Sequence, residues 1–130
     1  MCDVLIAEDE PTILETLSFL LGRAGWSVAS VTDGAAVLDM VRRTRPGMLV
    51  LDVMLPGRSG LDILRALRAD PEQAALPVLI LTARGQSHDR QLALDLKADG
   101  FISKPFANDD VVDEVQRLLG QRAARIAASG

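Results

Sequence analysis

Short apolar runs alternate with longer amphipathic segments along the whole chain. Each run has the length of a buried strand, and in the segments between them apolar residues recur every three or four positions, as in a helix. Pro11 suits the first turn of a helix, where its missing N–H would be unpaired, and Gly25 is typical of a helix end. The pattern predicts strands at residues 4–7, 27–31, 48–51, 78–82 and 99–103, and helices at 11–24, 33–43, 61–69, 86–97 and 107–119.

Strands that alternate with helices predict an α/β fold with a parallel sheet covered on both faces. Right-handed crossovers leave few topologies, and we expect the flavodoxin-like one, a doubly wound (βα)5 fold with a five-stranded sheet in the order 2-1-3-4-5. In that order the first and third strands are neighbours. The domain is expected to span residues 1–120, with residues 121–130 as an extension of the last helix or a tail.

Composition narrows the class of protein. The chain has 130 residues, 48% hydrophobic and 25% charged, which is typical of one globular domain. Its 14 basic and 18 acidic residues give a net charge of −4, which disfavours nucleic-acid binding by this domain. No apolar run has the length of a membrane-spanning helix. The single cysteine, Cys2, excludes an internal disulfide, so we expect a cytoplasmic protein.

Acidic residues end two of the predicted strands. Asp52 follows the run 48–51, and Glu8 and Asp9 follow the run 4–7. Ligands bind at the carboxyl ends of the strands in open α/β sheets, and adjacent first and third strands would bring these carboxylates together. When carboxylates lie that close together, their like charges raise the pKa of at least one of them unless a cation neutralises the charge. The sequence therefore predicts a site for a hard divalent ion such as Mg²⁺.

The residue types around this site suit phosphoryl transfer. A carboxylate can act as a nucleophile towards phosphorus, and the protein then mainly positions groups and neutralises charge. Asp52 is the candidate acceptor. The fifth strand ends near Lys104, which offers a cation, and the fourth ends near Thr82, which offers a hydroxyl.

Four motifs carry a resemblance to the receiver domains of two-component response regulators. They are Ile6 to Pro11 (IAEDEP), Leu51 to Gly57 (LDVMLPG), Ile80 to Arg84 (ILTAR) and Ile102 to Phe106 (ISKPF), in the order of the family. The resemblance spans about residues 3 to 120 and implies a chemotaxis-regulator-like signalling switch. Such a switch performs only its own phosphorylation and dephosphorylation and is not an enzyme acting on other substrates.

The resemblance also implies a role for each site residue. Asp52 would accept phosphate from a sensor histidine kinase or a phosphotransfer protein, and Lys104 would pair with the phosphoryl group through a loop whose bond to Pro105 is usually cis. Thr82 and Phe101 would form the conformational switch that controls an output partner or domain. Mg²⁺ would be held by Glu8, Asp9, Asp52 and the main-chain carbonyl of Met54. We also expect Met54 and Arg84 to flank the pocket.

The expected assembly is a monomer or a weak dimer. The pieces Arg84-Gly85 and Asp89-Arg90 resemble receivers that dimerise through the fourth helix, fifth strand and fifth helix. Gly100 and Glu114 stand where those dimers carry an acid and an arginine, so two cross-subunit ion pairs are not expected.

Two alternative functions belong to other classes of protein. The first is a pseudo-receiver, a binding module that signals without phosphate; the complete set of site residues disfavours it. The second is a Mg²⁺-dependent aspartyl phosphatase similar to haloacid dehalogenases. Those enzymes carry an acid two positions after the nucleophile, where this chain has Met54, which cannot transfer a proton.

Overall fold

Five strands and five helices alternate along the chain in a computed structural model that describes residues 2–83 and 87–129, with side chains described up to residue 120. The strands are β1 (Val4–Ala7), β2 (Val28–Val31), β3 (Met48–Asp52), β4 (Val78–Ala83) and β5 (Gly100–Lys104). The helices are α1 (Pro11–Arg23), α2 (Val37–Thr44), α3 (Gly60–Ala69), α4 (Ser87–Asp95) and α5 (Asn108–Ser129), and a 3₁₀ turn, η1 (Gly34–Ala36), precedes α2.

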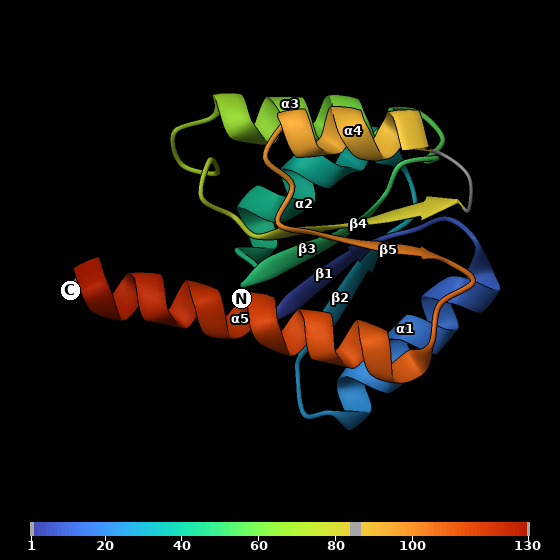
Figure 1. Ribbon diagram of the computed structural model, residues 1–130, viewed down its shortest axis with the longest axis horizontal. Helices are drawn as coiled ribbons and strands as arrows, with labels where there is room; N and C mark the ends of the chain where they lie inside the picture. The colour runs from blue at the N-terminus through green and yellow to red at the C-terminus, as the bar shows by residue number, and fades with distance from the viewer. Residues whose placement is uncertain (1, 84–86, 130) are drawn as a thin grey trace.

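The strands form one parallel sheet in the order β2-β1-β3-β4-β5, which confirms the predicted flavodoxin-like topology. The register pairs Ala7 of β1 with Leu51 of β3, and Asp52 with Leu81 of β4. In Figure 1, α1 and α5 cover one face of the sheet, and α2, α3 and α4 cover the other. All five strands therefore end at the same edge of the sheet, which is where ligands bind in this architecture.

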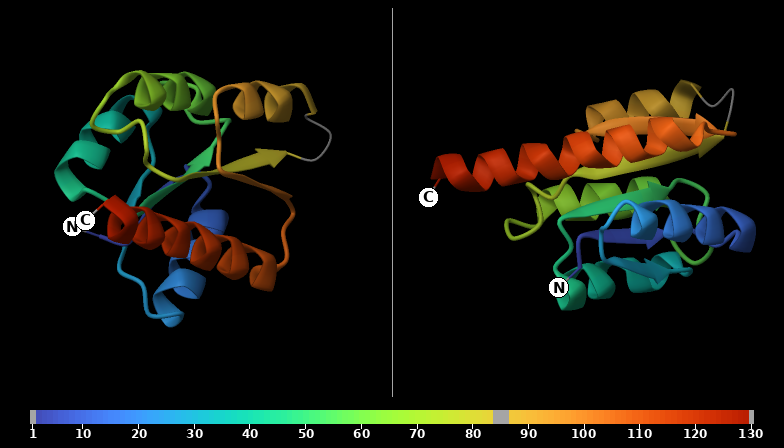
Figure 2. Two further views of the ribbon diagram at one scale, coloured as in Figure 1. Left: turned by 60° about the vertical axis from the view of Figure 1, so that its left-hand side comes forward. Right: turned by 90° about the horizontal axis from the view of Figure 1, so that it is seen from below.

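Helix α5 continues beyond residue 119, where the apolar helical pattern of the sequence ends, as in the helix extension that was one of the two expectations for this segment. It begins at Asn108 and its backbone stays helical to Ser129. The last turns extend past the end of the sheet, as Figure 1 and the right-hand view of Figure 2 show. In the part of the chain that the structure describes, no helix combines the length and the apolar character needed to cross a membrane.

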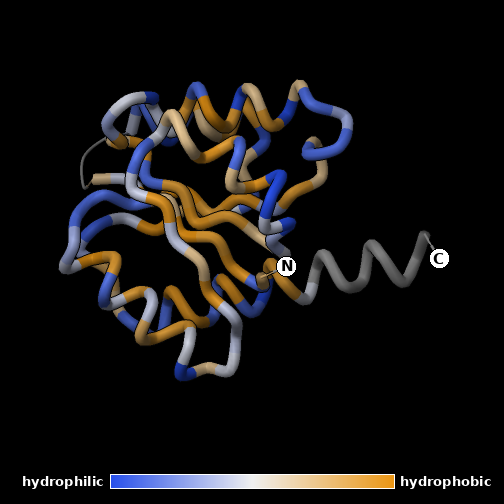
Figure 3. Tube along the Cα trace, turned by 180° about the vertical axis from the view of Figure 1, so that it is seen from behind, coloured by the Kyte–Doolittle hydropathy of each residue, from blue (hydrophilic) through white to orange (hydrophobic). Residues whose placement is uncertain are grey.

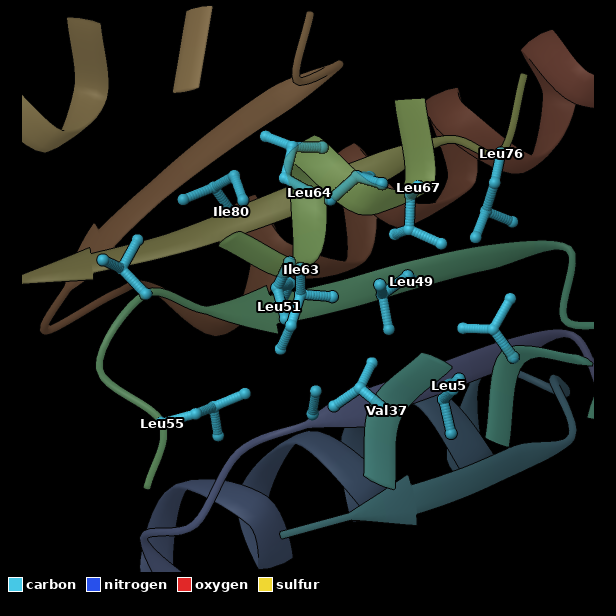
Figure 4. Packing of buried hydrophobic residues seen from close by; sticks show 14 of the residues in the cluster. Leu5, Val37, Leu49, Leu51, Leu55, Ile63, Leu64, Leu67, Leu76 and Ile80 are labelled. Atoms are coloured by element: carbon cyan, nitrogen blue, oxygen red, sulfur yellow. The ribbon is translucent and has the colours of Figure 1, made fainter. Parts of the chain in front are cut away.

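The core consists of two apolar layers, one on each side of the sheet. Alternate residues of a strand point to opposite faces, so Leu5 and Ala7 contact one layer while Val4 and Ile6 contact the other. Figure 3 shows the resulting band of hydrophobic strands between amphipathic helices. Figure 4 shows the layer beneath α2 and α3, where side chains such as Leu51 and Ile63 meet. Burial on both faces explains why the strands read as continuous apolar runs.

Some element boundaries differ from the prediction. The second helix was expected from Asp33, but Asp33 is the cap of η1, because its Oδ1 accepts a hydrogen bond from the amide of Ala35 at 2.9 Å. The fourth helix was expected to reach Lys97 but ends at Asp95, and Lys97 takes a left-handed conformation with φ 65°. The expected start of that helix, Gln86, lies outside the described residues.

A partly buried arginine ties the far end of α3 to two loops. The guanidinium of Arg68 donates to the main-chain carbonyls of Ala74, Leu76 and Lys97 and to the carboxylate of Asp99, the last two at 2.8 and 3.0 Å from Nη2. The side chains of Arg68 and Asp99 are only 14% and 17% exposed. This network fixes the segment that leads into β5.

Candidate functional site

The site lies at the carboxyl ends of four strands that are neighbours in the sheet, β1, β3, β4 and β5. Asp52 is the last residue of β3, Glu8 follows β1 directly, and Lys104 is the last residue of β5. Thr82 stands near the end of β4, one position beyond Leu81, which pairs with Asp52. The strand order thus brings together side chains that are up to 96 residues apart in the sequence.

The ammonium group of Lys104 joins two buried carboxylates. Its Nζ lies 3.0 Å from Oδ2 of Asp52 and 3.1 and 3.3 Å from the two carboxylate oxygens of Glu8. The Glu8 side chain is fully buried, that of Asp52 is 5% exposed, and that of Lys104 is 21% exposed. The peptide bond between Lys104 and Pro105 is cis.

Burial and the neighbouring carboxylate act in the same direction on Glu8. Burial disfavours its charged form and Asp52 adds to the effect, so the pKa of Glu8 rises from 4.5 to about 8 even though Lys104 opposes the shift. Burial also penalises the charge of Asp52. Hydrogen bonds from Glu8, the Met54 amide and Lys104 outweigh that penalty and hold the pKa of Asp52 below its ordinary value.

For Lys104 the balance again favours the charged form. Burial alone would lower its pKa, but its contacts with Asp52 and Glu8 raise the pKa above 10.5. At neutral pH the site therefore holds an ionised Asp52, a cationic Lys104 and a Glu8 that is largely neutral. An ionised carboxylate thus lies beside a fixed positive charge.

The carboxylates fit a hard divalent cation. Glu8, Asp9 and Asp52 each offer an oxygen, and these oxygens all lie within 4.8 Å of one another. Three clustered carboxylate oxygens suit Mg²⁺, which keeps several of its waters and takes few protein ligands. Asp9 is exposed, so the cluster opens to solvent on that side.

The loop after β3 contributes its main chain to the site. The amide of Met54 donates a hydrogen bond of 3.0 Å to Oδ1 of Asp52, while the Met54 side chain is 64% exposed. A groove of about 610 Å³ beside the site is lined by Asp9, Met54, Leu61 and Asp89, among others. Arg84, which we expected to flank the pocket with Met54, lies outside the described residues.

The two expected switch residues occupy different environments. Thr82 is buried, with 3% exposure, and its strand neighbour in β5 is Ser103. Phe101 is half-buried and packs against the layer beneath α3 and α4. The guanidinium of Arg90, on α4, lies 5.1 Å from the centroid of the Phe101 ring, a cation–π distance. Sequence reasoning assigned no such role to Arg90, because a contact between a helix and a strand leaves no local pattern.

Gly100 and Glu114 lie close to each other within one chain. These are the two positions at which we expected no ion pairs between subunits. Arg117 on α5 donates to Glu114 at 2.8 Å and to the main-chain carbonyl of Asp99 at 2.9 Å. A Cβ at position 100 would lie 2.7 Å from a carboxylate oxygen of Glu114 and 3.1 Å from the Arg117 guanidinium. The small residue at position 100 therefore makes room for this internal ion pair.

A family model described as "Response regulator receiver domain" matches residues 4–116. The chain belongs to the receiver domain family. Receiver domains are signalling switches, and the expected resemblance is confirmed over the segment that holds the whole site.

Known relatives agree with this assignment. The chain is 40% identical over 127 residues to the "Probable transcriptional regulatory protein TcrX" of Mycobacterium tuberculosis, an alignment that covers 98% of the chain and 53% of the relative. The chain thus spans about half the length of the curated relatives it matches.

Solved structures share the fold over most of the chain. The receiver domain of a histidine kinase from Syntrophus aciditrophicus is 31% identical, with a TM-score of 0.85 over 93% of this chain and 92% of that one. The receiver domain of a sensor histidine kinase from Pseudomonas aeruginosa is 27% identical, with a TM-score of 0.83 over 92% and 98%. That second structure holds a magnesium ion coordinated in its active-site cleft.

Proposed function

We propose that this receiver accepts a phosphoryl group on Asp52 from a phosphohistidine of a sensor kinase or phosphotransfer protein. In this step a carboxylate oxygen of Asp52 forms a P–O bond while the P–N bond of the phosphohistidine breaks. The electron pair of that bond returns to the imidazole nitrogen. The reaction replaces the P–N bond of the donor with the P–O bond to Asp52, so it needs no reactant other than the protein and the phosphohistidine.

The observation that carries this proposal is the state of Asp52. Its carboxylate is nearly buried, its pKa is held low, and the Lys104 ammonium stands 3.0 Å away. An ionised acid ready to attack phosphorus, beside a cation that can meet the incoming phosphoryl oxygens, is what phosphoryl transfer requires of a protein.

The remaining residues would complete the site. Glu8, Asp9, Asp52 and the carbonyl of Met54 would hold Mg²⁺, which when bound neutralises charge on the transferred phosphoryl group. The Thr82 hydroxyl would donate to another phosphoryl oxygen. Lys104 would then exchange its bonds to the two carboxylates for a bond to the phosphoryl group.

Phosphorylation would act as a switch through the face formed by α4, β5 and α5. A hydroxyl drawn towards the phosphoryl group leaves space behind it, and Phe101 on the neighbouring strand would turn inward to fill that space. The acyl phosphate would thereby bias a two-state equilibrium and reshape the face for an output partner or domain. We propose a monomer or a weak dimer for the receiver itself.

The test is incubation with a small phosphodonor such as phosphoramidate, with and without Mg²⁺, followed by intact-mass measurement. We expect the mass of one phosphoryl group to be added only with Mg²⁺, and to be absent from Asp52→Asn. Asp62→Asn is the matched control, because Asp62 is an exposed acid on α3 whose side chain is 55% exposed. Phosphate that survives in Asp52→Asn would refute the assignment of the acceptor.

A separate measurement addresses the pseudo-receiver. If the protein signals without phosphate, Asp52→Ala will bind its output partner as the unmodified wild type does, and phosphodonor will not change the affinity. We expect instead that phosphodonor changes the affinity of the wild type alone.

A further inference from the structure

The loop that carries Met54 leaves β3 at Val53 and reaches α3 at Gly60. At its base the amide of Gly60 donates to the carbonyl of Val53 at 3.0 Å. Gly60 also packs so tightly there that a Cβ would lie 2.3 Å from the carbonyl oxygen of Asp52. Leu55, on the other side of Met54, is buried in the core layer beneath α2 and α3. Both chain neighbours of Met54 are therefore held, while its own side chain is exposed.

The outer part of this loop rests on the turn between β2 and α2. The amide of Gly34 donates to the carbonyl of Pro56 at 2.8 Å. Gly34 is buried, and a Cβ at this position would lie within 3.0 Å of three main-chain atoms of Arg58. Two backbones approach this closely only where one of them carries glycine. A side chain at position 34 would have to push the loop away, since main-chain atoms cannot rotate aside.

A second contact joins the same two segments. Gly57 has φ 81°, in the left-handed region, and a Cβ there would lie 2.2 Å from the Asp33 carboxylate. That carboxylate is already fixed, because its Oδ1 accepts the Ala35 amide. The turn and the loop thus meet at two successive positions, Asp33 with Gly57 and Gly34 with Arg58.

We propose that Gly34 is a positioning residue for the acidic site. The turn at Asp33 and Gly34 supports the loop after β3, and this support determines the position of the Met54 main chain relative to Asp52. The Met54 amide holds Oδ1 of Asp52, so a loop displaced at Pro56 and Arg58 would also reorient the acceptor carboxylate. This inference rests on the proposed function in one respect, namely that the Met54 carbonyl is a magnesium ligand.

The test compares Gly34→Ala with Gly47→Ala. Gly47 is a matched control because its Cβ would also be crowded, 2.8 Å from the Leu119 side chain and 3.0 Å from the Asp3 carbonyl, but at the opposite edge of the sheet. Two readouts apply to each variant. The first is the chemical shift and hydrogen exchange of the Met54 amide by NMR without metal, and the second is the Mg²⁺ dissociation constant by calorimetry.

We expect Gly34→Ala to shift the Met54 amide, to speed its exchange and to raise the Mg²⁺ dissociation constant about 10-fold or more, as for other groups that orient ligands. Gly47→Ala should leave both readouts at wild-type values even where it lowers the melting temperature equally. An unchanged Met54 amide and unchanged affinity in Gly34→Ala would overturn the proposal, and so would equal changes in both variants.

If Gly34→Ala does not fold, Asp33→Ala takes its place in the test. This variant removes only the exposed carboxylate that caps η1 and packs against Gly57. We expect the Met54 amide and the Mg²⁺ dissociation constant to change in the same direction by smaller amounts, and no change would again overturn the proposal. The Met54 amide is measured without metal or phosphodonor. A wild type that fails to take phosphate would therefore refute the proposed function while this test of Gly34 still gives its answer.

Discussion

Replacing Lys104 with methionine tests the electrostatics of the site most directly. The side chain keeps much of its length but loses the ammonium that contacts Glu8 and Asp52 at 3.0 to 3.3 Å. Without metal, two buried carboxylates would then face each other with no cation between them. Glu8 can escape this by taking a proton, whereas Asp52 stays ionised. The cost of the substitution should therefore depend on pH.

The magnitude follows from which groups are charged. At pH 6 Glu8 is mostly neutral because its pKa is about 8, so the substitution mainly removes the bond from Lys104 to Asp52. A hydrogen bond to a charged group contributes about 2 kcal/mol. At pH 9 Glu8 is also ionised in the wild type, and breaking a buried ion pair costs about 4 kcal/mol. The pKa of Lys104 lies above 10.5, so the lysine itself stays charged at both values.

The assay is urea unfolding of metal-free protein at pH 6 and pH 9, followed by the fluorescence of Trp26, which is half-buried against the layer beneath α1 and α5. Lys97→Met is the matched control, because Lys97 is exposed and the chemical change is the same. We expect the control to stay within about 0.5 kcal/mol of the wild type. Equal costs for the two variants, or a larger cost for Lys104→Met at pH 6 than at pH 9, would refute the reasoning.

Three further predictions concern other groups. Glu8→Gln should flatten the pH dependence of the free energy of unfolding without metal. Because the pKa of Glu8 is raised, the wild type should lose up to about 1.4 kcal/mol of stability per pH unit as pH rises from 4.5 to about 8. An equal slope of stability against pH in both proteins would contradict this. Arg68→Met should lower the free energy of unfolding in urea by about 3 kcal/mol. The control is Arg65→Met on the same helix, where the side chain is 64% exposed and the expected loss is less than about 0.5 kcal/mol. Similar losses in the two variants would argue against a stabilising role for the Arg68 hydrogen bonds. Arg90→Gln should raise the rate of phosphorylation by a small donor about twofold to fivefold, because the lost cation–π contact of about 0.5–1 kcal/mol holds Phe101 in its observed position; a slower or unchanged rate would exclude this role.

The fold could be predicted because its signals are local. Both faces of the sheet are covered, so β1, β3 and most of β4 read as apolar runs. Leu17 and Leu21 recur on the buried side of α1 as a helix requires. Right-handed crossovers then leave few strand orders, and the flavodoxin-like order is a common one among them. Boundaries were predicted less well. The side chain of Asp33 competes for the backbone of the next turn, and the end of α4 at Asp95 depends on a left-handed residue that no periodicity signals.

The acidic cluster was also accessible from sequence, because parallel strands that are neighbours end at the same edge. Glu8, Asp9 and Asp52 come together for that reason alone. The contacts of Lys104 were not accessible in detail. That one ammonium reaches both Asp52 and Glu8, and that this leaves Glu8 largely neutral, depends on distances of a few tenths of an ångström and on how deeply each group is buried.

The order of apolar and polar residues by itself determined the elements, the sheet and the edge at which the carboxylates gather, because hydrophobic periodicity records which face of each element is buried. Only the tertiary structure decided which loop supports which. The contact of Gly34 with Arg58, the bonds of Arg68 to two loops and the position of Arg90 over Phe101 all join different helices, strands or loops. Such contacts arise from how helices and loops pack over the sheet, and packing between distant segments leaves no repeating pattern in the sequence.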